Sequence, residues 1–257
     1  MTAPGNAIEL ATLSADLLNR IAERGIRVHC LTNSVAEPIT ANALLAIGAV
    51  PSLTADSEEL PDFLRSADAL LINLGTPSAE KKAVRRLAAT VASKSGLPWV
   101  LDPVMVDRSD RRRTEAETLI AERPTAIRCN DAEAAALANS MTGLAGIIAC
   151  TGAVDRVRHG TRFASLAVGH PMLARITATG CALSAILAAF LAVHPKDRLA
   201  AGLAALAAFG AAGAEAAERA AGPGSLAVHL LDSLSTLDAE RIARRIESYE
   251  LRAEDSA

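Results

Sequence analysis

The chain has 257 residues, of which 51% are hydrophobic and 2% aromatic, and its formal net charge at pH 7 is −3. A chain of this length can bury one large core without disulfides or structural metals, and here the core must be built from small aliphatic side chains. The balanced charge argues against a nucleic-acid partner, and the short run Arg111-Arg112-Arg113 lies among acidic residues, as on a solvated face.

Cysteine spacing and the N-terminal sequence indicate a cytoplasmic protein. Cys30, Cys129, Cys150 and Cys181 are scattered and form no C-x-x-C pair, so neither a disulfide framework nor a zinc site is expected. The first ten residues lack the basic and apolar regions of a signal peptide. Leu199–Ala214 is unbroken apolar sequence, but it is shorter than the roughly 18 residues of a spanning helix. It is predicted to be a buried helix, and no membrane partner is expected.

The predicted elements alternate between strands and helices up to about residue 180. Short apolar runs, each ending in Asn, Asp, Gly or Thr, predict strands buried on both faces of a parallel sheet. Helix candidates lie between several of these strands. In chain order, the predictions are strand Arg27–Leu31, helix Pro38–Ile47, strands Ala49–Leu53 and Ala69–Leu74, helix Pro77–Ala92, strands Trp99–Leu101 and Thr125–Ile127, helix Asn130–Ala138 and strand Gly146–Cys150.

Beyond residue 179 the pattern predicts helices only. These are Thr179–Val193, Asp197–Ala220, Ser225–Leu234 and Leu237–Glu247. Residues from Leu251 onward are polar and are expected to fray. No linker or internal repeat divides the chain, so residues 1–257 are predicted to form a single α/β domain. Its mostly parallel sheet has helices on both faces and is followed by a helical C-terminal third.

The turn that precedes the predicted helix Thr179–Val193 is the strongest local signal. Ligands of such sheets bind at the carboxyl ends of the strands. In Ala178-Thr179-Gly180-Cys181 no bulky side chain crowds the helix start, so free N–H groups can bind a phosphate over Gly180. The same residues also suit a plain tight turn. A helix N-terminus lowers the pKa of a thiol, which makes Cys181 a candidate base, although most lone cysteines are inert core residues.

Charged residues follow two of the predicted strands. Glu133, three residues into a predicted helix, either caps that helix or holds a hydrated Mg²⁺ near phosphates. Asp102, at the end of a strand, is either a loop cap or a metal-binding carboxylate. Arg128 is placed to clamp a phosphate. Each of these signals is weak by itself.

Together, the motifs resemble those of hydroxyethylthiazole kinases, in the family's order and from about residue 27 to residue 235. They are Val28-His29-Cys30-Leu31-Thr32-Asn33, Thr40-Ala41-Asn42-Ala43-Leu44-Leu45-Ala46-Ile47-Gly48-Ala49, Leu71-Ile72-Asn73-Leu74-Gly75-Thr76, Asp102-Pro103-Val104, Ile127-Arg128-Cys129-Asn130-Asp131-Ala132-Glu133, Cys150-Thr151-Gly152-Ala153-Val154-Asp155, Gly169-His170-Pro171 and Thr179-Gly180-Cys181-Ala182-Leu183-Ser184-Ala185. No single motif is specific, but the combination is.

The resemblance implies a ribokinase-like fold and a homotrimer with active sites between neighbouring subunits. It also implies ATP- and Mg²⁺-dependent phosphorylation of the hydroxyl of 4-methyl-5-(2-hydroxyethyl)thiazole, in thiamine biosynthesis and salvage. Motif matching assigns the catalytic position facing the substrate hydroxyl to Cys181, ATP-binding positions to Arg128 and Thr151, metal positions to Asp102 and Glu133, and substrate-binding positions to Leu53, Ala178 and Gly180.

Departures from the family pattern leave other functions open. The family usually has glycine at position 178, methionine at position 53 and a Gly-Ala-Gly type of loop where this chain has Met105-Val106-Asp107. One alternative is a kinase of another small alcohol, such as hydroxymethylpyrimidine. Another is a ligand-binding or regulatory relative with weakened catalysis. We favour the active kinase because Cys181 and the charged positions around it are retained.

Overall fold

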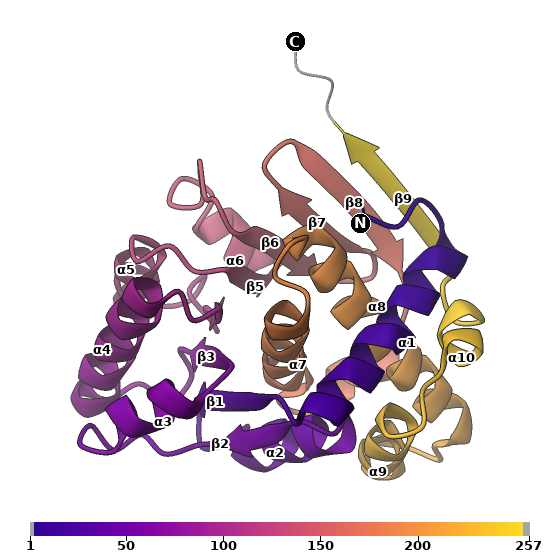
Figure 1. Ribbon diagram of the computed structural model, residues 1–257, viewed down its shortest axis with the longest axis horizontal. Helices are drawn as coiled ribbons and strands as arrows, with labels where there is room; N and C mark the ends of the chain where they lie inside the picture. Colours follow the sequence, from indigo (N-terminus) through magenta and orange to yellow (C-terminus); the bar gives the residue numbers. More distant parts are fainter. Residues whose placement is uncertain (1–2, 254–257) are drawn as a thin grey trace.

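A computed structural model describes residues 3–253 and has a nine-stranded sheet at its centre (Figure 1). The strand order is β2-β1-β3-β4-β5-β6-β7-β8-β9, parallel from β2 to β6 and antiparallel from β6 to β9. The strands are β1 Arg27–Leu31, β2 Val50–Ser52, β3 Ala69–Asn73, β4 Trp99–Asp102, β5 Ala126–Asn130, β6 Ile147–Thr151, β7 Asp155–His159, β8 Arg162–Ala167 and β9 Ser248–Ala253. The predicted mostly parallel α/β sheet is confirmed.

Helices cover both faces of this sheet, and each layer has its own hydrophobic cluster. One layer contains α1 Ala7–Arg24, α2 Glu37–Ala46, α7 Thr179–Val193, α8 Arg198–Arg219, α9 Pro223–Leu234 and α10 Ala239–Ala243. The other contains α3 Leu60–Ser66, α4 Ala79–Ser95, α5 Asp110–Ile120 and α6 Asp131–Ala136. A short 3₁₀ helix, η1 Pro171–Arg175, precedes α7.

Strand alternation decides which side chains reach the α7 layer. Successive residues of a strand point to opposite faces, and in β3 Leu71 packs in the α7 cluster whereas Leu70 and Ile72 pack in the α4 cluster. The last residues of β3 and β4, Asn73 and Asp102, therefore share the α7 face. Neighbouring parallel strands end at one edge, so these polar side chains meet above the start of α7.

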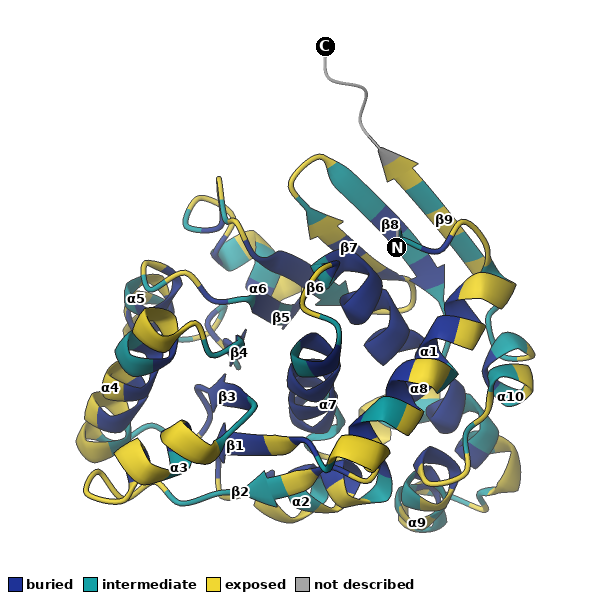
Figure 2. Cartoon of the chain, in the orientation of Figure 1, coloured by how far each residue is buried: buried dark blue, intermediate teal, exposed yellow. Residues whose placement is uncertain are grey.

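Helix α8 is the apolar segment predicted to be a buried helix, and the structure confirms this (Figure 2). Among the described helices it alone is long and apolar enough to cross a membrane, yet most of it is buried within the protein. Two glycines of α8 allow the segment before α7 to pack closely against this helix. A Cβ on Gly210 would lie 2.5 Å from Val168, and one on Gly213 would lie 2.5 Å from Leu173.

The C-terminal part corrects the prediction of helices alone. Within the predicted helix Leu237–Glu247, only Ala239–Ala243 is α-helical, and the chain continues as β9 beside β8. Leu251 is therefore paired in the sheet rather than frayed, since it and Tyr249 pack against the core. The remaining residues of the predicted frayed end, 254–257, lie outside the described part of the chain.

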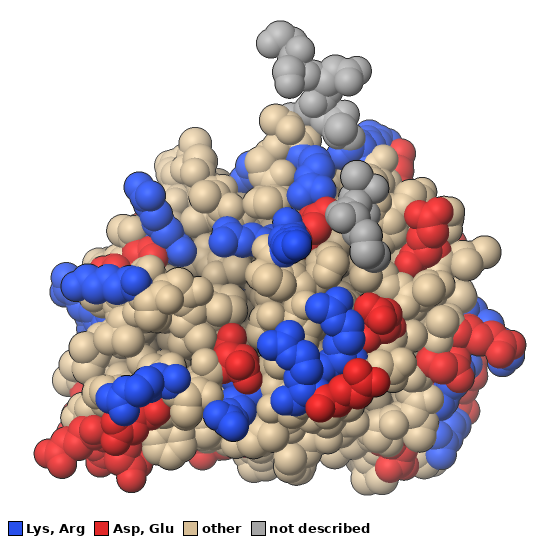
Figure 3. Space-filling model, in the orientation of Figure 1, with Lys and Arg blue, Asp and Glu red and all other residues tan. Residues whose placement is uncertain are grey.

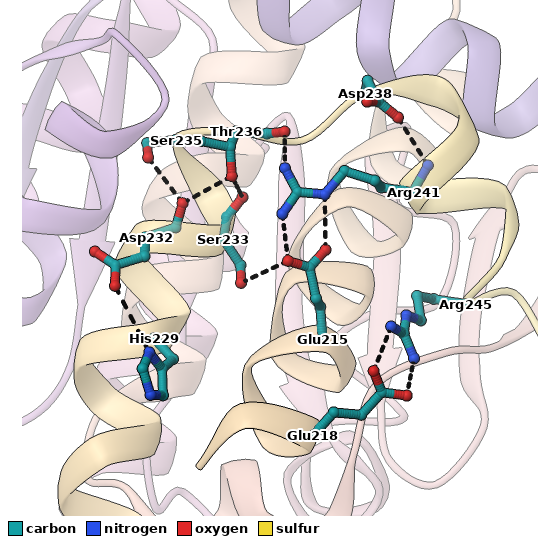
Figure 4. Close-up of polar contacts among 10 residues, drawn as sticks. All are labelled: Glu215, Glu218, His229, Asp232, Ser233, Ser235, Thr236, Asp238, Arg241 and Arg245. Carbon is teal, nitrogen blue, oxygen red and sulfur yellow. Dashed lines mark hydrogen bonds and ion pairs between the residues drawn. The ribbon is translucent and has the colours of Figure 1, made fainter.

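Two ion pairs join α8 to the segment that leads into β9 (Figure 4). Arg241 binds Glu215, which also accepts a hydrogen bond from Ser233 at 3.3 Å. Arg245 binds Glu218. These contacts fix the segment that carries β9 to the edge of the sheet.

Candidate active site

Polar side chains at or just after the ends of β1, β3 and β4 lie around the Cys181 sulfur. Asn73 Nδ2 lies 3.2 Å from Sγ, and Asn33 Nδ2, in the loop after β1, lies 3.6 Å from it. Burial, together with the nearby Asp102 charge, raises the pKa of the Cys181 thiol to about 12. The prediction that the helix N-terminus lowers this pKa is wrong, because desolvation outweighs the helix dipole. Cys181 is therefore a neutral thiol at physiological pH.

Asp102 lies beside this sulfur and is almost fully buried. Its Oδ2 atom accepts hydrogen bonds from Asn73 Nδ2 at 2.8 Å and from Ser184 Oγ at 2.9 Å. Its Oδ1 atom is buried and has no hydrogen-bond partner among residues 3–253. Burial raises the pKa of the carboxyl, and the Arg128 charge opposes that rise. Asp102 is thus a better proton acceptor than an exposed aspartate.

The Arg128 guanidinium covers the first turn of α7. A Cβ on Gly180 would lie 2.3 Å from Arg128 Nη1, so only glycine leaves room for this contact. Arg128 Nη2 also donates a hydrogen bond to Thr151 Oγ1, at the end of β6. Ala178, the N-cap residue of α7, offers no side-chain acceptor to the N–H groups of the first turn, and no side chain within residues 3–253 caps them. Uncapped N–H groups next to a guanidinium suit an anion such as a phosphate.

Glu133 caps α6, which confirms the simpler of its two interpretations. Its Oε2 accepts from Asn130 N at 3.0 Å, and Asn130 Oδ1 accepts from Glu133 N at 2.9 Å. Its Oε1 accepts from Met105 N at 2.8 Å and so also holds the loop after β4. Burial raises the pKa of Glu133, while these hydrogen bonds lower it.

The two acids fit a hydrated Mg²⁺ but not a metal held by protein ligands alone. Within residues 3–253, no cluster of three or more His, Cys, Asp or Glu side chains could hold a metal ion. Mg²⁺ usually keeps several waters and binds through one or two carboxylates and substrate phosphates. The Arg128 charge lowers the pKa of both Asp102 and Glu133, and the Asp102 charge raises the pKa of Glu133, so these charges lie in one small region.

Two of the three departures from the family pattern, at position 178 and in the Met105 loop, fall at left-handed backbone. Ala178 has φ 62° and Met105 has φ 60°. Residues other than glycine rarely adopt this conformation, which costs them on the order of 1 kcal/mol or more. The left-handed backbone explains why glycine, as in the family pattern, would suit positions 178 and 105. The turn before α7 keeps its left-handed backbone although it lacks the glycine.

A cavity of about 620 Å³ opens beside Arg128, and its lining includes neither Asn33 nor Asn73. Arg128, Thr151, Thr179 and Gly180 lie at one part of its wall. Apolar residues of α8 and of the segment before α7 line another part, among them Phe209 and Leu173. Leu53, in the loop after β2, is partly buried against the core and does not line this cavity. The structure brings the other predicted site residues together around Arg128 and the first turn of α7.

No role was predicted for Asn33, Asn73 or Ser184, which bind Cys181 and Asp102. A signal for the asparagines was present, because Asn33 follows one predicted strand and Asn73 is the last residue but one of another. The arginine run 111–113 was predicted to lie on a solvated face. Arg112 instead is half-buried, and its Nη1 donates to Val104 O at 2.9 Å, which fixes the loop after Asp102.

Comparison with known proteins gives consistent results. A model of the hydroxyethylthiazole kinase family matches residues 18–147 and 142–240. A probable hydroxyethylthiazole kinase of Agrobacterium fabrum is 42% identical, over 90% of this chain and 93% of its own length. The hydroxyethylthiazole kinase of Granulibacter bethesdensis is 41% identical, over 91% and 94%.

Solved structures agree with the fold. The hydroxyethylthiazole kinase protein of Pyrococcus horikoshii has a TM-score of 0.88 and 34% identity, with 93% of this chain and 98% of that chain covered. A ribokinase-like superfamily protein of Enterococcus faecalis has a TM-score of 0.56 at 16% identity, with coverage of 86% and 93%. The second similarity shows a shared ribokinase-like fold.

Proposed function

This chain belongs to the hydroxyethylthiazole kinase family, and we propose that it transfers the terminal phosphate of ATP to the hydroxyl of 4-methyl-5-(2-hydroxyethyl)thiazole in thiamine biosynthesis and salvage. One observation carries the proposal. The Asn73 amide joins Cys181 to Asp102, immediately beside the Arg128 guanidinium on the first turn of α7. A site for an alcohol therefore adjoins a site for a phosphate.

The phosphate side of the site supplies positive charge and hydrogen-bond donors. Phosphoryl transfer depends mainly on positioning and on neutralising charge in a loose transition state. Arg128 and the uncapped N-terminus of α7 provide both for the transferred phosphate. Thr151 holds the guanidinium in place. The adjoining cavity of about 620 Å³ is large enough for the rest of the nucleotide.

On the acceptor side, Cys181 orients the alcohol and passes its proton on. The neutral thiol accepts a hydrogen bond from the hydroxyl and donates its own proton toward Asp102 Oδ1, the buried oxygen without a partner. As the bond between the alcohol oxygen and the γ-phosphorus forms, the bond from that phosphorus to the bridging oxygen breaks and ADP leaves with that electron pair. The hydroxyl proton moves to sulfur and the thiol proton moves to Asp102. A carboxyl with a raised pKa suits that role near neutral pH.

Mg²⁺, when bound with ATP, neutralises phosphate charge and orients the nucleotide. In this chain Glu133 and Asp102 supply the negative charge that would face the hydrated ion. Asn130 N and Met105 N already hold the Glu133 carboxylate in place, so its charge is positioned before an ion would bind.

Release of ADP from purified protein tests the proposed reaction. The protein should release ADP with MgATP and hydroxyethylthiazole, much more slowly with hydroxymethylpyrimidine, and only at background rate with the ethylthiazole that lacks the hydroxyl. Omission of Mg²⁺ should abolish the release. Binding of the thiazole without any ADP release would instead identify a regulatory relative.

We also propose that the protein assembles as a homotrimer in the cytoplasm, as the family resemblance implies. Three large apolar side chains, Val35, Leu45 and Val50, are 58%, 58% and 49% exposed. They lie around α2 and the edge strand β2, close to the loop that carries Leu53. A second copy that covers them would also close the acceptor side of the site.

Sedimentation tests the assembly. Leu45→Lys should dissociate the oligomer and raise the KM for the thiazole. The matched control is Val228→Lys on α9, where the native side chain is 59% exposed, and it should change neither property. A native chain that sediments only as a monomer at micromolar concentration would contradict the proposal.

A further inference from the structure

The loop after β3 has a constrained conformation that fixes the Asn73 amide. Gly75 N donates to Asn73 Oδ1 at 2.9 Å. A Cβ on Gly75 would lie 2.6 Å from Asn33 Cβ, so the backbone passes directly against that side chain. The next residue, Thr76, has φ 42°, an unfavourable value for a β-branched residue. Such a loop keeps its shape only if surrounding contacts hold it.

A buried arginine on the opposite face of the sheet makes that contact. Arg85 Nη2, from α4, donates to Gly75 O at 2.7 Å. Its Nη1 lies 3.2 Å from Glu115 Oε1, from α5. The two side chains are 2% and 4% exposed, so neither charge is solvated. Replacing a buried ion pair by apolar residues often leaves the stability of a protein unchanged. A contribution to stability therefore does not by itself explain why the Arg85–Glu115 pair is present.

The contacts form a continuous chain from Arg85 to the reacting groups. Gly75 N and Asn33 Nδ2, the latter at 3.0 Å, both bind Asn73 Oδ1. These two hydrogen bonds fix the orientation of the Asn73 amide, with Oδ1 toward Gly75 and Asn33. Asn73 Nδ2 consequently faces Asp102 and Cys181. Gly75 O, which Arg85 binds, and Gly75 N belong to the two peptide groups on either side of Gly75 Cα. If the backbone torsions at Gly75 were free to change, the amide would lose one of the two donors that set its orientation.

We propose that Arg85, held by Glu115, is a positioning residue for the acceptor side of the active site. It acts through Gly75 on Asn73, and through Asn73 on the geometry of Cys181 and Asp102. The inference rests on the proposed kinase function for its effect on catalysis. Its structural part, the restraint on Gly75, stands independently of that function.

The main test replaces both charges together, since Arg85→Met alone would leave Glu115 buried and unpaired. The double variant Arg85→Met/Glu115→Leu should keep the native Tm and the KM for ATP, while its kcat falls about tenfold, the size of effect a small misplacement can produce. Arg85→Lys, which keeps a donor for Gly75 O, should recover part of the kcat. The control Arg20→Met removes a guanidinium from the Val193 carbonyl at the far end of α7 and should leave kcat unchanged.

Two further readouts separate positioning from a general structural role. In an Asn73→Ala background the double substitution should lower kcat no further, because the path through Asn73 is already broken. The Gly75 amide should exchange its hydrogen at least tenfold faster in the double variant, a readout that requires no catalysis. Native kcat in a folded double variant, additive losses with Asn73→Ala, or unchanged Gly75 exchange would each overturn the inference. An inactive native chain would instead contradict the kinase function.

Discussion

The two sides of Cys181 are built in different ways. On the acceptor side, Asn33 and Asn73 are neutral, buried and bonded to each other at 3.0 Å. On the phosphate side, Arg128 is half-buried and faces a cavity of about 620 Å³. On the acceptor side, the hydrogen bond between the two amides fixes the positions of the side chains. On the phosphate side, Arg128 provides positive charge and the cavity provides space for a charged ligand.

This difference indicates how each side should respond to change. Electrostatic interactions strengthen as water is excluded, and they depend on the protonation of each group. Changes on the phosphate side should therefore alter nucleotide binding, and changes near the amides should alter turnover. Basic and acidic side chains are interspersed over the visible face of the molecule (Figure 3).

The largest effect is expected where the two sides meet. Asp102→Asn keeps the shape of the side chain but removes the proton acceptor, so kcat should fall about 100-fold or more. Stability should not fall, because a buried charge is removed. Steady-state kinetics and thermal unfolding check this, with Asp131→Asn on the exposed surface of α6 as the control. A kcat within threefold of the native value would remove Asp102 from the proton path.

The second largest effect is expected from Gly180→Ala, which should affect the phosphate side of the site but not the acceptor side. Gly180→Ala places a methyl 2.3 Å from the native position of Arg128 Nη1 and must displace the guanidinium. The KM for ATP should rise about tenfold, the cost of weakening one charge-assisted contact, while the KM for the thiazole changes little. The control Gly224→Ala meets no atom within 4 Å. Equal increases in both KM values would show that the two sides are not separable.

A smaller effect is expected at Ala178, where φ is 62°. Ala178→Gly should stabilise the fold by about 1 kcal/mol, which for a chain of this size raises Tm by about 2–4 °C. It should also raise activity on hydroxyethylthiazole or widen the choice of alcohols. Arg123→Gly, at φ 59° in the loop before β5, should stabilise the fold without changing kinetics. Native kinetics of Ala178→Gly on every alcohol would place position 178 away from the reacting groups.

The smallest effect depends on pH. Burial raises the pKa of Asp155, in the cavity wall, from 3.8 to about 6. An acid with a raised folded-state pKa favours folding below pH 4, and this contribution is lost as pH rises through 6. Asp155→Asn should therefore stabilise the protein more at pH 8 than at pH 5, by about 1 kcal/mol. Urea unfolding at both pH values tests this, and an equal effect at both would contradict the pKa shift.

The parallel part of the sheet was predictable from sequence because its strands are buried on both faces. Runs such as Ala69–Asn73 are continuously apolar until their polar last residue. The prediction missed β7, β8 and β9. In β7 buried and exposed residues alternate, and arginines occupy exposed positions, so no apolar run marks the strand. Pairing with distant residues, rather than local pattern, decides this part of the fold.

The site residues were predictable where a motif carried them, as with Asp102, Arg128 and Cys181. Their electrostatics were not predictable. The helix start indicates a low pKa for Cys181, whereas the pKa is raised to about 12 by burial under residues distant in sequence. The role of Arg85 was likewise hidden, because only the folded chain brings its guanidinium to Gly75.

The fate of the transferred phosphate tests the central claim most directly. Purified protein is incubated with MgATP and hydroxyethylthiazole, and the products are followed by phosphorus NMR. The account predicts one new phosphate monoester of the thiazole alcohol for each ADP formed, with no excess inorganic phosphate. Formation of ADP and inorganic phosphate without the monoester would show that water, not the alcohol held at Cys181, is the acceptor, and would contradict the account.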